Sequence, residues 1–314
     1  MEGVLGDWHS YSDIVVKENR TAAAIRAPGR SGVRGLTALH KIHKGRTGLR
    51  DGELMTEAAV LVSHRDLICE ITLNRPAHRN AMSPEMLGPF QQVIDQVKTD
   101  RDIRCVVITG NGANFCSGAD FRSGILDRGN ELPHDASYGI YRPFLTILDV
   151  QVPVIAAMNG HAIGGGFGLG LVCDLRVANS EARYGANFAR LGIHSGMAIS
   201  YLLPRIVGVP RAAELLFTGR VFSGTEAAAM GIANYAVEPG QVLAKSRELA
   251  AEIAACAPVA VRMMKRSLYR GLNWDPKAAG EIEAFAQSRT LEMADAQEGV
   301  AALLEKRQPQ FRGV

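Results

Sequence analysis

The sequence predicts an α/β fold in which buried strands alternate with helices and a helical region follows. Three segments predict strands, because 105–110, 152–160 and 175–180 are apolar along most of their length. Continuous apolar runs of this kind are typical of strands that are buried on both faces of a sheet. After Arg211 the strand signals stop, and helical patterns continue along the rest of the chain.

Residues 58–76, "AAVLVSHRDLICEITLNRP", open the regular part of the chain. They predict two short strands around a turn in "SHRD", ended by Pro76. A helix is expected over 83–100, because Ser83 is suited to the N-cap and Pro84 to the first helical position. One face of this helix is apolar at helical spacing, with Met86, Phe90, Val93, Ile94 and Val97.

A glycine-rich run follows the strand at 152–160 and leads into a predicted helix at 168–174, before the strand at 175–180. Four helical stretches are then expected, at 211–219, 223–231, 239–269 and 276–307, of which the last two are long and amphipathic. This order of elements predicts an α/β body followed by a helical tail.

Composition indicates a globular protein in a reducing compartment. Hydrophobic residues make up 47% and charged residues 21% of the 314 residues, enough to bury a large core. The five cysteines are scattered and form no CxxC pair, so we expect no disulfide framework, no metal site and a cytoplasmic location. Even the apolar run 150–173 is interrupted by Asn159, His161 and glycines, so we expect no membrane segment.

The first 54 residues differ from the rest of the chain. They hold nine Lys or Arg against six Asp or Glu, so the net charge of +3 lies here and the remainder is balanced. These residues show no lasting hydrophobic period of 2 or 3.6, which predicts a poorly ordered extension. We expect translation to start at Met55, which makes residues 1–54 an artefact; the alternative is a genuine flexible arm. Nucleic-acid binding would depend on this segment alone, so none is expected.

Two turns of small residues follow predicted strands, "NFCSGADF" at 114–121 and "NGHAIGGGFGLGLVCD" at 159–174. The second is not a dinucleotide loop, because Leu169 stands where GxGxxG needs its third glycine. Bare N–H groups at two strand ends can converge on one oxygen atom, and a helix N-terminus adds its positive dipole. Such a pair is suited to the negative charge of a thioester enolate. Tight packing of a helix on a strand is the alternative.

Five segments in this order resemble the crotonase family, the enoyl-CoA hydratases and isomerases: "LNRPAHRNAM" (73–82), "VVITGNGANFCSGAD" (106–120), "PVIAAMNGHAIGGGFGLGLVCDLRVA" (153–178), "LLFTGRVFSGTEAAAMGIAN" (215–234) and "EGVAALLEKRQPQF" (298–311). The resemblance covers residues 57–313. It implies a crotonase-like spiral of stacked ββα units over 55–240 and a C-terminal helical oligomerisation region over 241–314. It also implies a homotrimer or hexamer that acts on an acyl-CoA thioester, with coenzyme A as part of the substrate and no separate cofactor.

The resemblance also implies site residues. The family's oxyanion hole consists of two backbone N–H groups, which fall on Ala119 and Gly165. The positions expected to bind coenzyme A are Ala77, His78, Arg79, Ser117 and Gly118. A guanidinium at Arg79 is suited to a phosphate group. Asp120 belongs to the same turn, where it is expected beside the substrate or as a backbone cap.

Two glutamates that hydratases of the family need to hold and activate water are missing. The position two residues after the three glycines is Gly168, and the position in the family's F-G-x-P-E segment is Phe188. Phe188 is expected to line the pocket and exclude water, which disfavours hydration. Isomerases of the family keep one carboxylate at or near these positions as their base, and this chain lacks that base too.

Other side chains are candidates to move a proton. His194 follows Phe188 closely and could shuttle a proton, because imidazole titrates near neutral pH; a structural histidine is the alternative. Residues 122–142 resemble the family's variable lid, which offers Glu131, His134, Asp135, Tyr138 and Tyr141. The sequence does not choose among them.

The sequence therefore favours an enzyme in which the oxyanion hole stabilises a thioester enolate. Isomerase, lyase or decarboxylase chemistry fits better than hydration, because loss of CO2 forms an enolate without a base. The alternative is a non-catalytic acyl-CoA-binding protein, whose pocket Gly168 and Phe188 have enlarged and dried.

Overall fold

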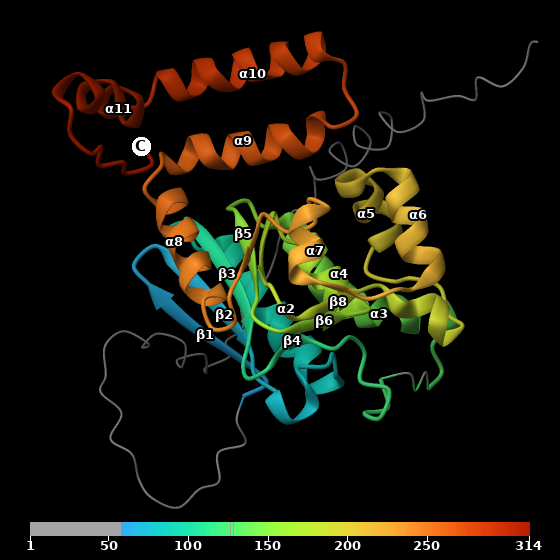
Figure 1. Cartoon of the computed structure of the whole chain (residues 1–314). Helices are drawn as coiled ribbons and strands as arrows, with labels where there is room; N and C mark the ends of the chain where they lie inside the picture. Colours follow the sequence, from blue (N-terminus) through green and yellow to red (C-terminus); the bar gives the residue numbers. More distant parts are fainter. Residues whose placement is uncertain (1–57, 126, 128) are drawn as a thin grey trace, which may run out of the picture. The chain divides into compact units, whose positions relative to one another are not determined.

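The computed structural model describes residues 58–125, 127 and 129–314, so the predicted extension 1–54 and the expected start at Met55 lie outside the described residues. The predicted α/β class is confirmed. A six-stranded sheet forms the centre of the body, in the order β1-β2-β3-β5-β7-β10 (Figure 1). Its strands are β1 (Val60–Arg65), β2 (Ile68–Leu73), β3 (Cys105–Gly110), β5 (Val154–Met158), β7 (Leu175–Asn179) and β10 (Tyr235–Val237). β1 is antiparallel to β2, and the other neighbouring pairs are parallel.

A second, smaller sheet runs in the order β4-β6-β8-β9. Its strands are β4 (Asn114–Cys116), β6 (His161–Ile163), β8 (Arg183–Gly185) and β9 (Phe222–Ser223). They are too short to show a hydrophobic period, so the sequence did not predict them. In the chain, β4 follows β3, β6 follows β5 and β8 follows β7. This repetition is the expected stacking of ββα units.

The body also contains seven α-helices and three short 3-10 helices within the described residues. They are α2 (Pro84–Thr99), α3 (Pro133–Leu145), α4 (Gly165–Val172), α5 (Ile199–Val207), α6 (Val209–Thr218), α7 (Gly224–Ala229), α8 (Val242–Ala254), η2 (Pro76–His78), η3 (Thr146–Asp149) and η4 (Asn187–Leu191). α2 begins after Ser83 as predicted and buries Met86, Phe90, Ile94 and Val97. Burying each such side chain contributes about 1.5–3 kcal/mol.

The two faces of the large sheet are covered by different elements, because successive strand residues point to opposite faces. α8 covers one face, where Val242 and Ala250 pack with Cys105, Val107, Ile155, Ala157 and Val177. The intervening residues, such as Val106, Ile108 and Ala156, belong to the main core with α2. Both faces of β3 and β5 are thus buried, which accounts for their continuous apolar sequence.

Three further helices, α9 (Pro258–Gly271), α10 (Pro276–Leu291) and α11 (Ala294–Glu305), lie beyond α8 (Figure 1). Each long stretch predicted from the sequence is two helices, because Pro258 cannot continue α8 and the chain turns again between α10 and α11. Lys265 holds α9 to the body, with its Nζ 2.7 Å from Asp174 Oδ2 and 2.9 Å from the Val152 carbonyl oxygen. The expected boundary at 240/241 puts α8 in the helical region, whereas α8 packs on the sheet.

The first hairpin is tighter than expected, because β1 continues through Arg65 and the chain turns at Asp66 and Leu67. The five cysteines are free thiols, of which Cys256 is exposed.

Among the described residues, no helix has the length and apolar content needed to cross a membrane. In the same part of the chain, no three His, Cys, Asp or Glu side chains gather in a group that could hold a metal ion.

Candidate active site

Three segments meet at one edge of the small sheet, because they follow its parallel strands β4, β6 and β8. These segments are 117–120, 164–165 and 186–188. The carboxyl ends of neighbouring parallel strands lie at the same edge of a sheet, where α/β proteins commonly bind ligands. The Gly164 N–H donates a hydrogen bond of 2.8 Å to the Gly185 carbonyl, which ties the second segment to the end of β8.

The first two segments are in backbone contact. Gly118 has a φ of +89°, and a β-carbon there would lie 2.8 Å from the Ile163 carbonyl oxygen and 3.3 Å from the Gly165 nitrogen. A β-carbon at Gly166 would collide with the Cys116 carbonyl. Only glycine permits this approach. The small residues of both motifs therefore allow the two turns to touch, as the sequence predicts.

The N–H groups of Ala119 and Gly165 are both available to a ligand. The Met82 N–H donates to the Gly118 carbonyl, and the Met82 carbonyl accepts from the Asp120 N–H, both at 2.8 Å. The N–H of Ala119, which lies between these two residues, therefore points away from Met82. Gly165 is the first residue of α4, where an N–H has no acceptor within the helix. Among the described residues neither N–H has a hydrogen-bond acceptor. Their role as an oxyanion hole stays a prediction.

Apolar side chains occupy the space around the two positions where the glutamates are missing. A β-carbon at Gly168 would overlap Met197 Cβ and lie 3.1 Å from Ile199 Cγ1. The ring of Phe188 is buried, and its Cζ would lie 3.7 Å from a β-carbon at Gly164. The Asn187 Oδ1 lies beside it, 3.4 Å from the same point. Sequence analysis did not single out Asn187 or Met197, because neither belongs to a recognisable motif.

Asp120 stabilises its own turn. Its carboxylate lies 3.6 Å from Arg75 Nη1 and accepts a hydrogen bond of 3.2 Å from the Arg122 N–H. Its main-chain carbonyl accepts from the Ser123 hydroxyl. Of the two roles expected for Asp120, these contacts describe the backbone cap; a contact with substrate stays a prediction.

The predicted coenzyme A positions lie side by side on the surface. Ala77, His78 and Arg79 are exposed around η2, and the Ser117 N–H donates to the Arg79 carbonyl at 3.1 Å. This bond sets the exposed turn next to Ser117 and Gly118. Buried Asn80 fixes the turn from beneath, because its side chain accepts from the Arg75 N–H and donates to the Asn114 carbonyl. Sequence analysis did not identify Asn80.

His194 and most of the lid residues face solvent. His194 is exposed, with its Nδ1 2.7 Å from the Ser195 carbonyl oxygen. Four of the five lid candidates, Glu131, His134, Asp135 and Tyr138, are also exposed. Tyr141 differs: it is half-buried, and its ring contacts the glycine-rich segments. A proton-transfer role for His194 stays a prediction.

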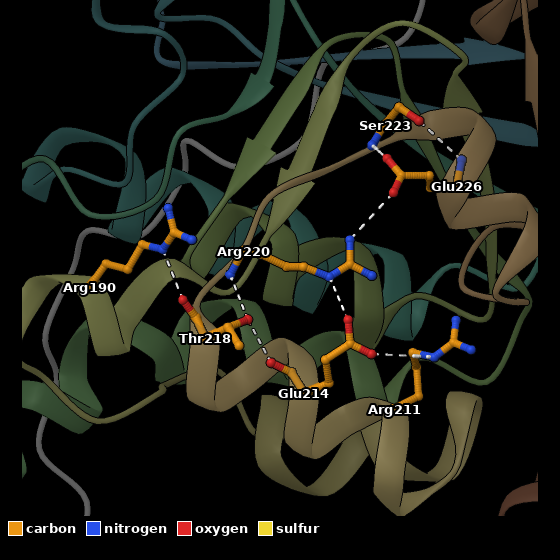
Figure 2. A network of polar contacts seen from close by, with 7 residues as sticks. All are labelled: Arg190, Arg211, Glu214, Thr218, Arg220, Ser223 and Glu226. Atoms are coloured by element: carbon orange, nitrogen blue, oxygen red, sulfur yellow. Dashed lines mark hydrogen bonds and ion pairs between the residues drawn. The ribbon is translucent and has the colours of Figure 1, made fainter.

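A polar network holds η4, the segment that carries Phe188, against the rest of the body (Figure 2). Arg190 in η4 donates to the Thr218 carbonyl at the end of α6 (2.9 Å), and its Cγ would lie 3.0 Å from a β-carbon at Gly219. Arg220 then joins Glu214 of α6 (2.8 Å) to Glu226 of α7 (3.4 Å). The Arg190 bond joins η4, the segment of Phe188, to the end of α6, and the Arg220 contacts join α6 to α7.

Known proteins resemble this chain in sequence and in fold. The family described as enoyl-CoA hydratase/isomerase matches residues 64–314. The human enoyl-CoA hydratase domain-containing protein 2, mitochondrial, is 38% identical over 256 residues, which cover 78% of this chain and 86% of that protein. The short-chain-enoyl-CoA hydratase of Clostridium acetobutylicum is 32% identical, with 79% and 95% covered. The crystal structure of an enoyl-CoA hydratase from Bacillus anthracis has a TM-score of 0.78 at 33% identity and covers 82% of this chain and 100% of that chain.

Proposed function

The chain belongs to the enoyl-CoA hydratase/isomerase family, and from this premise we propose that it converts an acyl-CoA thioester through an enolate bound by the Ala119 and Gly165 N–H groups. The observation that supports the proposal is the backbone contact between the two turns that carry these N–H groups, neither of which has an acceptor among the described residues. Donors aimed at a developing oxyanion are more effective in a protein site than in water, because they do not have to reorganise. The loss of one such donor typically costs about 2.7–4 kcal/mol of transition-state stabilisation.

Isomerase, lyase or decarboxylase chemistry suits this site better than hydration. Water addition in the usual way needs carboxylates to hold and activate the water, and the matching positions are Gly168 and Phe188. Met197 and Ile199 lie beside Gly168, where a β-carbon would overlap Met197 Cβ, so this position cannot carry a carboxylate side chain without a change in the loop. A reaction that forms the enolate by losing CO2 needs only the hole and a proton donor.

The exposed turn at 77–79 is the proposed binding surface for coenzyme A. The bond from the Ser117 N–H to the Arg79 carbonyl supports this, because Ser117 is two residues before Ala119. We infer that the nucleotide part of coenzyme A lies over this turn when the thioester carbonyl is at Ala119 and Gly165. The Arg79 guanidinium is free to meet a phosphate group, as is the His78 ring. Coenzyme A acts here as part of the substrate, without a separate cofactor.

We also propose that the chain assembles into a trimer or hexamer through its C-terminal helices. α10 buries none of its residues within the chain, and Phe285, Leu303 and Leu304 are each at least 70% exposed. A soluble protein rarely leaves so large an apolar surface uncovered. Free thiols at four buried positions suit a reducing compartment, and we propose the cytoplasm.

The alternative is a protein that binds acyl-CoA without converting it, which the buried apolar ring of Phe188 also suits. Gly168 does not enlarge the pocket as expected, because Met197 and Ile199 lie against it. One experiment separates the two. The full chain is incubated with 2-enoyl, 3-enoyl, 3-hydroxyacyl and malonyl-type CoA thioesters; mass spectrometry follows the products and calorimetry follows binding. We expect CO2 release, cleavage or a double-bond shift. Binding without product identifies the alternative, and hydration at about 1 per second or faster contradicts the proposed reaction type.

A further inference from the structure

A tyrosine of the lid helix bridges the candidate hole and the loop before α5. Tyr141 lies in the third turn of α3, and its Cε1 would be 3.7 Å from a β-carbon at Gly165. Its opposite edge passes over Gly196, where a β-carbon would overlap Cε2 and Cζ and lie 2.5 Å from the hydroxyl oxygen. The ring therefore contacts the segment that carries the Gly165 N–H.

Gly196 is glycine because of this ring. Its φ lies outside the positive range, so the backbone itself would accept an alanine. The obstacle is the hydroxyl-bearing edge of Tyr141, which occupies the volume of any side chain at this position. A larger residue at 196 would displace the Tyr141 hydroxyl, which makes the pair a specific fit.

Among the described residues near the glycine-rich turns, Tyr141 is also a titratable side chain whose polar group makes no hydrogen bond or ion pair. Asp120 is paired with Arg75, and the His194 ring is bonded to the Ser195 carbonyl. Met82 and Phe188, which also lie against the glycines, carry no exchangeable proton. The Cys116 thiol beside Gly166 is fully buried in the core, and burial raises its pKa to about 12. Among the described residues the Tyr141 hydroxyl has no hydrogen-bond partner, and burial raises the pKa of Tyr141, so the phenol keeps its proton at neutral pH.

We propose that Tyr141 is the proton donor of this site and that its hydroxyl protonates the α-carbon of the enolate held by Ala119 and Gly165. The inference rests on the proposed function, because it needs an enolate to be formed. Tyr141 then provides the proton that the missing glutamates cannot. A phenol is a stronger acid than the α-carbon of a thioester, so it gives up its proton to the α-carbon of the enolate.

The step balances without any further reactant. In a malonyl-type thioester, the bond between the α-carbon and the carboxylate breaks, CO2 leaves, and the electron pair forms the enolate. The α-carbon then takes the proton from Tyr141 Oη, and the thioester carbonyl forms again. The resulting phenolate regains a proton from water.

The test compares the full-length protein with Tyr141→Phe, which keeps the ring over Gly196. Both act on methylmalonyl-CoA in D2O, and CO2 release, KM and the configuration of deuterium at the α-carbon of propionyl-CoA are measured. We expect kcat to fall about 100-fold or more, with KM unchanged. We also expect deuterium on one face with the wild type and on both faces with the variant, because solvent then protonates the enolate.

Two further variants separate proton donation from packing. Gly196→Ala pushes the hydroxyl away, so it should reproduce the loss in kcat and add nothing to Tyr141→Phe in the double variant. Tyr235→Phe, at an exposed tyrosine of β10 outside the candidate site, should change nothing. If the wild type releases no CO2, the proposed cleavage fails and the assignment of Tyr141 fails with it. If the wild type releases CO2 and Tyr141→Phe is equally fast and equally stereospecific, only the assignment of Tyr141 is overturned.

Discussion

Gly168 faces Met197 at a distance that leaves no room for a side chain at position 168. A β-carbon there would overlap the Cβ of Met197, an atom next to the backbone, which cannot move aside as the end of a flexible side chain can. Met197 is itself buried and has a φ of +56°. The loop before α5 thus fills the volume that a glutamate at 168 would need, so the missing carboxylate is a feature of the local fold and cannot be restored by one substitution.

We expect Gly168→Ala to destabilise the protein by about 1–3 kcal/mol, because overpacking of this size displaces neighbouring backbone. This loss should exceed the gain of up to about 1 kcal/mol that alanine brings inside a helix. Urea unfolding measures the difference. Gly88→Ala in α2 is the matched control, since a β-carbon there would meet nothing within 4 Å, and it should be neutral or stabilising. A double variant with Met197→Gly should lose less than the sum of the single variants; strict additivity would show that the contact carries no energy.

The second prediction isolates the N–H group of Gly165. Proline is tolerated at the first position of a helix, so Gly165→Pro removes the N–H while α4 can still form. Gly165→Ala is the control that adds a β-carbon and keeps the N–H; in both variants this carbon meets the mobile Met82 Sδ at 3.1 Å. We expect kcat to fall about 10²–10³-fold with proline and far less with alanine. Equal losses would mean that packing, and not the N–H, matters at this position.

Helices and strands with a local apolar pattern could be predicted from the sequence, whereas those that depend on distant contacts could not. β3, β5 and α2 were predicted from sequence, because their apolar spacing depends on few neighbouring residues. β4, β6 and β8 were not, since three residues show no period and their pairing depends on the other strands of the sheet. Arg176 interrupts the apolar strand β7, yet its buried guanidinium donates to the Cys173 and Ile232 carbonyls, which only the folded chain brings within reach.

The candidate site shows the same division. The two small-residue turns at 114–121 and 159–174 could be brought together from the sequence, because each follows a buried strand. Ala119 and Gly165 as the two donors came from the resemblance to the family. The choice of Tyr141 among five lid residues depends on its fit over Gly196, which lies far along the chain in the loop between η4 and α5, and no local pattern records this contact. Likewise, Asn80 and Met197 act through contacts with distant backbone.

The third prediction concerns the start of α7, which the network in Figure 2 includes. The Ser223 hydroxyl accepts from the Glu226 N–H (3.1 Å), and the Glu226 carboxylate accepts from the Ser223 N–H (2.7 Å), forming a capping box. Ser223→Ala should cost about 1 kcal/mol of unfolding free energy, and Ser223→Gly only a few tenths. The Ser223 N–H lowers the pKa of Glu226, so its half of the box is present at neutral pH and is lost as pH falls through that lowered pKa. Unfolding curves at pH 7 and pH 3 check both statements; an alanine variant as stable as the wild type would contradict the first.

The fourth prediction concerns thiol reactivity. Burial raises the pKa of Cys69 to about 11 and those of Cys105, Cys116 and Cys173 to about 12, whereas Cys256 is exposed. Thiolates are the reactive form, so a rise from 9.0 to about 11 lowers reactivity at pH 8 by about two orders of magnitude. An aromatic disulfide reagent should therefore modify about one thiol quickly in the native protein and all five after unfolding. Cys256→Ser should remove the fast reaction; a fast reaction that survives this change would mean that a buried thiol opens readily.

The last prediction concerns the exposed apolar side chains of α11. Leu303 and Leu304 are 78% and 77% exposed, and water contact with so much adjoining apolar surface is unfavourable unless a second chain covers it. Leu303→Glu combined with Leu304→Glu would place two charges in such an interface, where each would have to be desolvated. We expect light scattering to give a trimer or hexamer for the wild type and a smaller species for this variant, with an unchanged circular dichroism spectrum. Leu148→Glu, at an exposed leucine of η3 in the α/β body, is the control and should leave the mass unchanged. Both leucines lie far along the chain from the glycine-rich turns. Equal activity per chain in the smaller species would therefore mean that each chain holds a complete site. A parallel loss of mass and activity would mean that assembly completes the site.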